Sequence, residues 1–253
     1  MQGEPQEFLY HRATELWKQS RFPIAFTGAG ISVASGIPDF RSPGGLWSKY
    51  DPMKVATAEA IQNNPRAVWE FLLDTADLLQ SSEPNAAHVA LATLEAEHRL
   101  QGIITQNVDN LHQRAGSQEV VEFHGNFERF YCQRCGQEEA RDTVQDKAHQ
   151  SIPPMCEKCD SYLRPDVVFF GEAIPAQAMQ RSQGLLRKAD LILIAGTSGE
   201  VAPANTIPRE IKMKGGHVIE INKGITFYRD ITDIRFDGPV EHILPRFLEF
   251  LKE

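Results

Sequence analysis

Short runs of apolar residues alternate with helical patterns along most of the chain, and this alternation constrains the fold more than any other feature. The strand candidates are 23–27 (PIAFT), 102–106 (GIITQ), 120–124 (VVEFH), 167–170 (VVFF), 191–195 (LILIA) and 217–222 (HVIEIN). Several are apolar throughout, as expected for strands buried on both faces of a parallel sheet. Helical spacing of apolar residues is found in 5–20, 65–80, 85–98, 175–189 and 240–253. We therefore predict an α/β fold with a doubly wound, Rossmann-like parallel sheet.

Two stretches interrupt this alternation. Residues 41–83 are poor in strand candidates and read as a helical insertion, and residues 127–165 are polar and contain every cysteine. We expect these two insertions to build a smaller lobe. The main domain would then consist of residues 1–40, 84–126 and 166–253.

The overall charge limits the classes of partner. Lys and Arg total 26 against 34 Asp and Glu, for a formal net charge of -8. Neutralising phosphates requires clustered cations, so we expect no direct nucleic-acid binding, and a basic peptide is the more natural macromolecular partner. No run of about 18 apolar residues predicts a membrane span, and the first residues lack the basic start and apolar run of a secretory signal. We therefore expect no membrane partner and a cytoplasmic location. We also expect the chain to be a monomer.

The four cysteines form two Cys-x-x-Cys pairs, Cys132 with Cys135 and Cys156 with Cys159. Two such pairs at this spacing can converge on one tetrahedral zinc ion. Redox-active or disulfide-bonded pairs are the alternatives, and a zinc ribbon that binds nucleic acid is a competing function. Four thiolates would fill the coordination sphere and leave no position for a reactive water. We therefore predict one structural Zn ion.

A glycine-rich turn, Gly28-Ala29-Gly30, follows the first predicted strand and precedes a helical turn. Backbone amides in this position can hold a pyrophosphate. Val33 stands where a dinucleotide fingerprint has its third glycine, so the turn alone fits a simple tight turn equally well.

Polar side chains follow the next two strand candidates. Gln106 ends 102–106 and is followed by Asn107 and Asp109, and His124 ends 120–124. The carboxyl ends of parallel strands bind ligands in open α/β folds. A histidine at such an end suits a general base, because its ordinary pKa of about 6.5 lies near working pH. A helix-capping turn and a structural histidine are the alternatives.

Four longer strings resolve these alternatives. They are GAGISVASGIPDFR (28–41), TQNVDNLHQRAG (105–116), VVFFGE (167–172) and GTS (196–198). Together they resemble the sirtuin family, in its bacterial type, from about residue 25 to the end of the chain. The resemblance implies an NAD-dependent protein-lysine deacylase (deacetylase), which transfers the acyl group to ADP-ribose and is therefore a transferase. It also implies that residues 1–40, 84–126 and 166–253 form the NAD-binding domain and that 41–83 carries the cofactor loop.

The resemblance also implies roles for individual residues. His124 would be the catalytic base, and Asn107 and Asp109 would bind and orient the nicotinamide amide. The implied NAD-binding residues are Gly28, Ala29, Gly30, Ser32, Ile37, Asp39, Phe40, Arg41, Gln106, Asn107, Asp109, Gly196, Thr197, Ser198, Asn222 and Val240. An acyl-lysine peptide would lie as an added strand along Val168, Phe169, Phe170, Gly171, Glu172, Gly199, Glu200 and Val201.

The sequence departs from the family pattern at three places. Gly199 stands where many members have Leu, and Pro239-Val240-Glu241 replaces the usual small residues near the adenine. Leu72 and Thr75 occupy the positions of a Tyr-x-x-Arg pair in members that prefer succinyl or malonyl lysine. Without that guanidinium we predict a preference for acetyl or longer apolar acyl groups. A protein ADP-ribosyltransferase and a noncatalytic module that binds NAD or ADP-ribose are the alternative functions.

Overall fold

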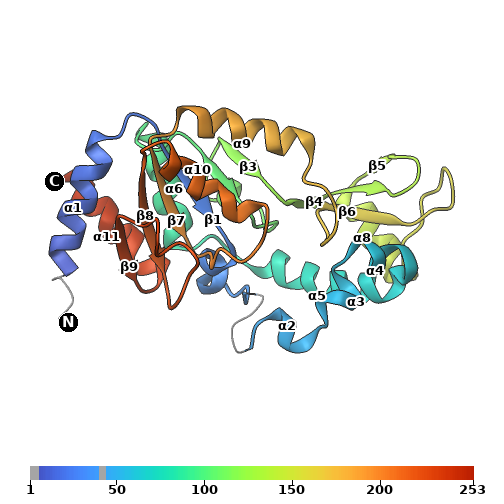
Figure 1. Cartoon of the computed structure of the whole chain (residues 1–253). Helices are drawn as coiled ribbons and strands as arrows, with labels where there is room; N and C mark the ends of the chain where they lie inside the picture. Colours follow the sequence, from blue (N-terminus) through green and yellow to red (C-terminus); the bar gives the residue numbers. More distant parts are fainter. Residues whose placement is uncertain (1–5, 40–43) are drawn as a thin grey trace.

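The computed structural model describes residues 6–39 and 44–253, and it contains the predicted parallel sheet (Figure 1). Six strands lie in the order β3-β2-β1-β7-β8-β9, and every neighbouring pair is parallel. The strands are β1 (Pro23–Thr27), β2 (Ile103–Thr105), β3 (Val120–Glu122), β7 (Leu191–Ala195), β8 (His217–Asn222) and β9 (Ile234–Asp237). The prediction of a doubly wound α/β fold is therefore confirmed.

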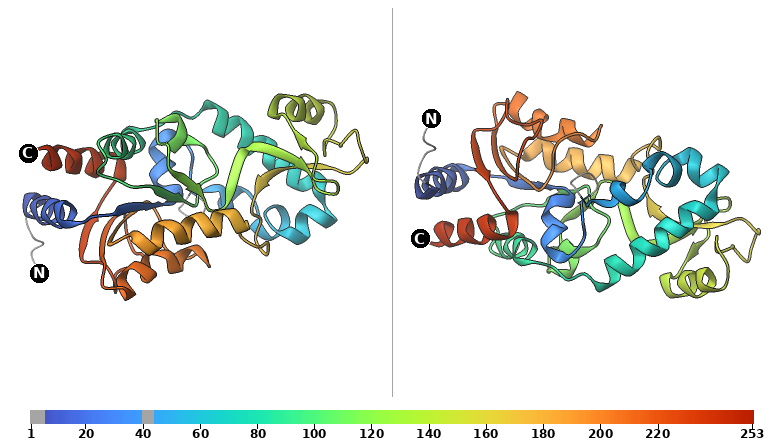
Figure 2. Two further views of the ribbon diagram at one scale, coloured as in Figure 1. Left: turned by 90° about the horizontal axis from the view of Figure 1, so that it is seen from above. Right: turned by 90° about the horizontal axis from the view of Figure 1, so that it is seen from below.

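Helices cover both faces of this sheet, as Figure 2 shows from above and below. Alternate residues of β1 point to opposite faces, so Ala25 joins one apolar cluster while Ile24 and Phe26 join the other. The first face is covered by α1 (Gln6–Gln19), α6 (Ala86–Ala96) and α11 (Val240–Lys252). The second is covered by α9 (Ala176–Lys188) and α10 (Ile207–Met213). Shorter turns are η1 (Ala29–Ser35), α7 (Leu111–Arg114) and η2 (Ala204–Thr206).

A smaller lobe lies at the carboxyl side of the main sheet, on the right of Figure 1. Its helices are α2 (Leu46–Lys49), α3 (Pro52–Val55), α4 (Ala58–Asn63), α5 (Pro65–Ser81) and α8 (Arg141–Gln150). Its antiparallel sheet has the order β5-β4-β6, formed by β4 (Gly125–Cys132), β5 (Glu138–Glu139) and β6 (Leu163–Val167). One apolar cluster joins the helices to this sheet, and the indole nitrogen of Trp69 donates to the backbone oxygen of Leu163 at 2.9 Å.

Two details of the main sheet differ from the sequence expectations. The run 167–170 is not a strand of the main sheet. Val167 is the last residue of β6, where it pairs with Gly125, and Phe170 forms an isolated bridge to Thr57. Its apolar character reflects instead the burial of Phe169 in the small lobe. The edge strand β9 was not predicted, because its four residues are too few to show a period.

No helix in the described ranges combines the length and apolarity needed to cross a bilayer.

Candidate functional site

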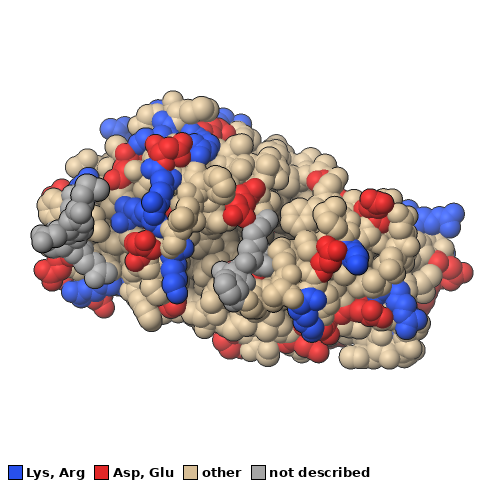
Figure 3. Space-filling view, turned by 60° about the horizontal axis from the view of Figure 1, so that its bottom comes forward, with Lys and Arg blue, Asp and Glu red and all other residues tan. Residues whose placement is uncertain are grey.

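The predicted site residues of the main sheet gather at one edge. Because the strands are parallel, the segments that follow β1, β2, β3, β7 and β8 all emerge at its carboxyl side. The chain continues from β1 to β2 and β3 on one side, and β7, β8 and β9 lie on the other. This reversal at β1 and β7 is the switch point where doubly wound sheets bind extended ligands. Figure 3 shows a hollow on the underside of the molecule with a mostly uncharged floor.

Two glycine turns pack against each other at the switch point. The amide of Gly30 donates to the oxygen of Gly196 at 2.8 Å, and the amide of Gly28 donates to Ala195 at 3.2 Å. A Cβ on Gly30 would lie 2.8 Å from the Cα of Gly196, so this contact requires glycine. Of the three amides in the turn, only that of Ala29 makes no hydrogen bond to a described residue. The turn can therefore offer a phosphate fewer donors than its sequence predicts.

The side-chain amides after β2 are fixed in orientation. Gln106 donates from Nε2 to the oxygen of Thr27 at 3.3 Å and to Oγ1 of Thr197 at 2.9 Å. Asn107 donates from Nδ2 to the oxygen of Gly28 at 3.2 Å. Since backbone oxygens only accept, these contacts leave the side-chain oxygens of both residues for a ligand. This part of the site is thus built to accept hydrogen bonds from hydroxyl or amide groups.

Asp109 is buried next to these amides. Its Oδ2 accepts from the hydroxyl of Ser32 at 2.6 Å, and its Oδ1 accepts from the amide of Leu111 at 3.0 Å. Burial raises the pKa of the Asp109 carboxyl, and the hydrogen bonds from Ser32 and Leu111 act in the opposite direction. Ser32 also accepts from Nδ2 of Asn107 at 3.2 Å, so the three predicted residues form one hydrogen-bonded group.

His124 lies just after β3, with Nδ1 3.2 Å from the backbone oxygen of Gln106. That oxygen fixes the proton on Nδ1, so Nε2 is the basic nitrogen of the neutral ring. Burial lowers the pKa of His124, and the hydrogen bond to Gln106 partly offsets this effect. The ring is therefore neutral at pH 7, as a general base must be.

Two further histidines support this group. Nε2 of His88 lies 3.5 Å from the hydroxyl of Ser32, and Nε2 of His112 lies 2.9 Å from the hydroxyl of Thr27. Their rings pack at 4.9 Å, and burial lowers the pKa of His88 to about 4. The sequence motifs gave His88 no role. The available signal was its place on the apolar face of α6, three residues after the N-cap Asn85.

The predicted peptide-binding segment 168–172 is tied to the site by its backbone. The amide of Val168 donates to the oxygen of His124 at 2.9 Å, and Phe170 exchanges hydrogen bonds with Ala56 and Ala58. Phe169 is buried, whereas Phe170 and Gly171 are exposed.

The carboxylate of Glu172 points into the small lobe. It accepts two hydrogen bonds from Arg164, at 2.6 and 2.8 Å, and one from the amide of Phe169 at 2.9 Å. Arg164 is 2% exposed and also lies over the ring of Phe169. The structure therefore gives Glu172 the contacts of a residue that shapes the loop.

The remaining predicted residues fall into three groups. Gly196, Thr197, Ser198 and Asn222 lie at the β7 and β8 ends, and Gly199, Glu200 and Val201 continue from them. The side chains of Ile37 and Val240 are buried in apolar clusters. Val240 can therefore contact a ligand only through its backbone. Asp39 is partly buried. Phe40 and Arg41 lie outside the described residues.

The four cysteines converge in the small lobe. Their sulfur atoms all lie within 4.8 Å of one another, with Cys132 3.5 Å from Cys159 and Cys135 3.8 Å from Cys156. A tetrahedral zinc ion with bonds of about 2.3 Å needs sulfurs about 3.8 Å apart. The four thiols are therefore positioned to bind one metal ion, and all four positions of such an ion would be occupied.

The chain is similar to known proteins over nearly its full length. Residues 28–203 match the model of the Sir2 family. A Pyrobaculum aerophilum protein named NAD-dependent protein deacylase 2 is 44% identical over 238 residues, which cover 94% of each chain. A solved Sir2 structure with a p53 peptide and NAD+ is 36% identical, with a TM-score of 0.87 and 98% of each chain covered. A solved Sir2 variant with deacetylated p53 peptide and 3'-O-acetyl ADP-ribose is 37% identical, with a TM-score of 0.91 and coverage of 94% and 97%. The chain belongs to the Sir2 family.

Proposed function

We propose that this chain removes acetyl or other apolar acyl groups from protein lysine in an NAD-dependent reaction that yields nicotinamide and O-acyl-ADP-ribose. The observation that carries this proposal is the placement of His124 beside the fixed amides of Gln106 and Asn107, with an Nε2 that makes no hydrogen bond to any described residue. Two relatives of the same fold, 36% and 37% identical, were solved with such ligands. One holds a p53 peptide and NAD+, and the other holds a deacetylated p53 peptide and 3'-O-acetyl ADP-ribose.

NAD would span the switch point of the sheet. The nicotinamide half would lie over the ends of β2 and β3, where Asn107 and Asp109 meet its carboxamide and Gln106 accepts from the ribose. The adenosine half would lie over the ends of β7 and β8, near Thr197 and Asn222. The acceptor oxygens of this edge suit the hydroxyl and amide donors of such a ligand.

Bound NAD supplies a ribose activated at C1′, because nicotinamide is a good leaving group and the acyl oxygen of lysine can replace it. The chain's own contribution is orientation and proton transfer. Nε2 of His124 would accept the proton of a ribose hydroxyl that attacks the acyl carbon, and one water molecule would be consumed as the lysine amine leaves. Asp109 and the neighbouring amides would hold the nicotinamide ribose in a fixed polar environment, which would favour the positive charge that develops when nicotinamide leaves.

The peptide would add as a strand between Val168–Glu172 and Gly199–Val201, where main-chain hydrogen bonds tolerate many sequences. The family positions that recognise acidic acyl groups carry no cation here. Leu72 is buried in the small-lobe cluster, and the hydroxyl of Thr75 donates to the backbone of Phe71. These contacts support a preference for apolar acyl groups.

We also propose that the four cysteines bind one structural zinc ion. We propose the domain division that the sequence predicts, with a main domain of residues 1–40, 84–126 and 166–253 and insertions at 41–83 and 127–165. Two Cys-x-x-Cys pairs that form a metal site fit a reducing, cytoplasmic setting, where disulfides are rare. The negative net charge supports peptide partners over nucleic acid. We further propose that the chain works as a monomer.

A panel of acetyl-, butyryl- and succinyl-lysine peptides tests this function with NAD labelled in the adenylate. We expect stoichiometric release of nicotinamide and deacylated peptide, with the label on a small molecule. Label that remains on protein would instead indicate an ADP-ribosyltransferase. NAD binding without turnover of any peptide would indicate a noncatalytic binding module.

A further inference from the structure

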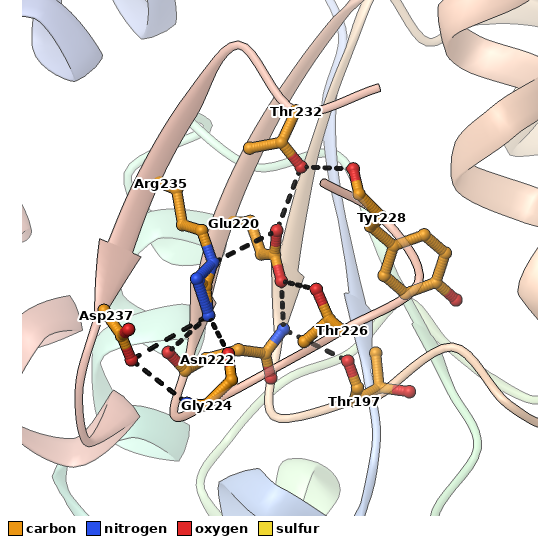
Figure 4. Close-up of polar contacts among 9 residues, drawn as sticks. All are labelled: Thr197, Glu220, Asn222, Gly224, Thr226, Tyr228, Thr232, Arg235 and Asp237. Atoms are coloured by element: carbon orange, nitrogen blue, oxygen red, sulfur yellow. Dashed lines mark hydrogen bonds and ion pairs between the residues drawn. The ribbon is translucent and has the colours of Figure 1, made fainter. Parts of the chain in front are cut away.

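The strongest unassigned feature is a buried carboxylate behind the predicted adenosine side of the site. Glu220 lies in the middle of β8 and is 0% exposed, and its side chain is surrounded by polar partners (Figure 4). Oε1 accepts from Nδ2 of Asn222 at 3.0 Å and from the hydroxyl of Thr226. Oε2 accepts from the hydroxyl of Thr232 at 3.0 Å and lies 3.6 Å from Nε of Arg235. A buried charge is tolerated only with such partners, so its position is fixed.

This carboxylate determines how the amide of Asn222 is turned. Nδ2 of Asn222 carries two hydrogens, and it donates to Glu220 and to the backbone oxygen of Thr197 at 3.1 Å. Neither partner atom can donate, so the nitrogen and oxygen of this amide cannot be exchanged. Oδ1 therefore points away from Glu220, as Figure 4 shows, and no group in the described part of the chain donates to it.

The same cluster holds the loop that follows Asn222. Arg235 donates to the backbone oxygen of Gly224 and lies 3.5 Å from that of Asn222. Asp237 accepts from the amide of Gly224 at 3.0 Å. Backbone and side chain of the residue at the β8 end are thus fixed before any ligand arrives.

We propose that Glu220 is a positioning residue that makes Asn222 an obligate hydrogen-bond acceptor, and that this selects a cofactor with an unphosphorylated adenosine ribose. The inference rests on the proposed function, because it requires the adenosine half of NAD to lie over β7 and β8. A ribose hydroxyl can donate to Oδ1 of Asn222. A phosphate on that ribose offers only acceptor oxygens at neutral pH. These oxygens would be repelled by Oδ1 of Asn222, which is also an acceptor.

Charge alone does not make this selection. Lys223 is exposed beside Asn222 and would attract a phosphate, and Arg235 is already engaged by Glu220 and two backbone oxygens. The selection follows from the direction of the amide. It should therefore disappear when the amide is free to turn.

The test measures kcat and KM for NAD and NADP with a saturating acetyl-lysine peptide. We expect the wild-type chain to favour NAD by about a hundredfold or more in kcat/KM. The main variant is Glu220→Leu with Arg235→Met, which removes the buried carboxylate together with its partly buried cation. It is expected to raise the KM for NAD about tenfold, to change kcat less than twofold, and to reduce the preference over NADP at least about tenfold.

Three controls separate positioning from general destabilisation. Glu220→Gln keeps an acceptor for Asn222 and Thr226 and should restore wild-type KM and cofactor preference. Ile219→Val shortens the neighbouring side chain of β8, which is 1% exposed, and should lower thermal stability without changing either constant. If the double variant does not fold, Thr226→Val with Thr232→Val removes two donors to Glu220 and should raise the KM for NAD several-fold at unchanged kcat.

Unchanged KM and unchanged cofactor preference in the folded double variant would overturn the inference, as would a loss confined to kcat. A wild-type chain that uses NADP as well as NAD would overturn it too. Absence of any NAD-dependent deacylation by the wild-type chain would instead contradict the proposed function itself.

Discussion

The imidazole of His124 and the backbone oxygen of Gln106 lie 3.2 Å apart, and this contact sets the chemistry of the histidine. It holds the proton on Nδ1 and leaves Nε2 as the base. Gln106 is also the residue whose side-chain oxygen is left free for a ligand. The base and one ligand-binding group are therefore positioned by a single residue at the end of β2.

Replacement of this base should affect turnover and leave cofactor binding intact. We expect His124→Ala to lower kcat for deacetylation by about 10²- to 10⁴-fold, the usual contribution of a positioned general base. The dissociation constant for NAD, measured by calorimetry, should change by less than about threefold. His149→Ala removes an exposed histidine of α8 and serves as the control. Equal losses in the two variants would contradict the assignment.

The kcat/KM for deacetylation should fall as the solution is made acidic. The active form of His124 is neutral, and burial lowers its pKa, so protonation requires a pH below the ordinary value of about 6.5. The profile of kcat/KM is therefore expected to be flat from pH 7 to 8 and to fall with a midpoint below about 6.5. A midpoint above 7 would show that another group limits the reaction.

Loss of the Glu172 carboxylate should change peptide binding more than NAD binding. Glu172→Gln breaks the bidentate pair with Arg164, whose side chain is 3% exposed, and leaves that cation poorly paired. We expect a loss of about 2–3 kcal/mol in the free energy of unfolding, since Glu172 is itself partly exposed. The KM for acetyl-lysine peptide should rise at least about fivefold in steady-state assays. Asp77→Asn, on the exposed face of α5, is the control and should change neither quantity.

The metal site should stabilise the small lobe. Cys132 and Cys156 are buried in the same apolar cluster as Trp69 and Phe130, so removal of the ion should loosen that cluster. We expect Cys132→Ser to lose zinc and to be cleaved by protease within residues 127–165, as detected by metal analysis and mass spectrometry. Arg134→Ala changes an exposed residue of the same knuckle and should keep both zinc and resistance. Full resistance in a zinc-free Cys132→Ser protein would refute a structural role.

Acyl selectivity should follow the side chains at 72 and 75. Because Leu72 is buried among apolar residues and Thr75 bonds to its own helix, nothing there pairs with a second carboxylate. We expect acetyl-lysine turnover to exceed succinyl-lysine turnover by at least about tenfold. Leu72→Tyr with Thr75→Arg should narrow that gap, and Thr75→Gln should not. Equal turnover of both substrates by the wild-type chain would contradict the prediction.

Local sequence was sufficient for the parts of this protein that depend on periodicity and spacing. Uniformly apolar strands predicted a parallel sheet, because such strands must be buried on both faces. The order of the chain then placed Gln106, His124 and Asn222 at one edge, since parallel strands end on the same side. The spacing of Cys132, Cys135, Cys156 and Cys159 predicted their convergence, which the structure contains.

Only the tertiary structure decided which atoms of these residues face a ligand. The amides of Gly28 and Gly30 are used by the β7 turn, Glu172 points to Arg164, and Asn222 is turned by Glu220. The first two outcomes depend on hydrogen-bond partners in other segments. The third depends on Glu220, two residues away on the same strand, together with the backbone of Thr197 in the β7 turn. A sequence pattern encodes which side chains are buried, but a buried polar atom takes its direction from its partners, and folding alone brings those partners together.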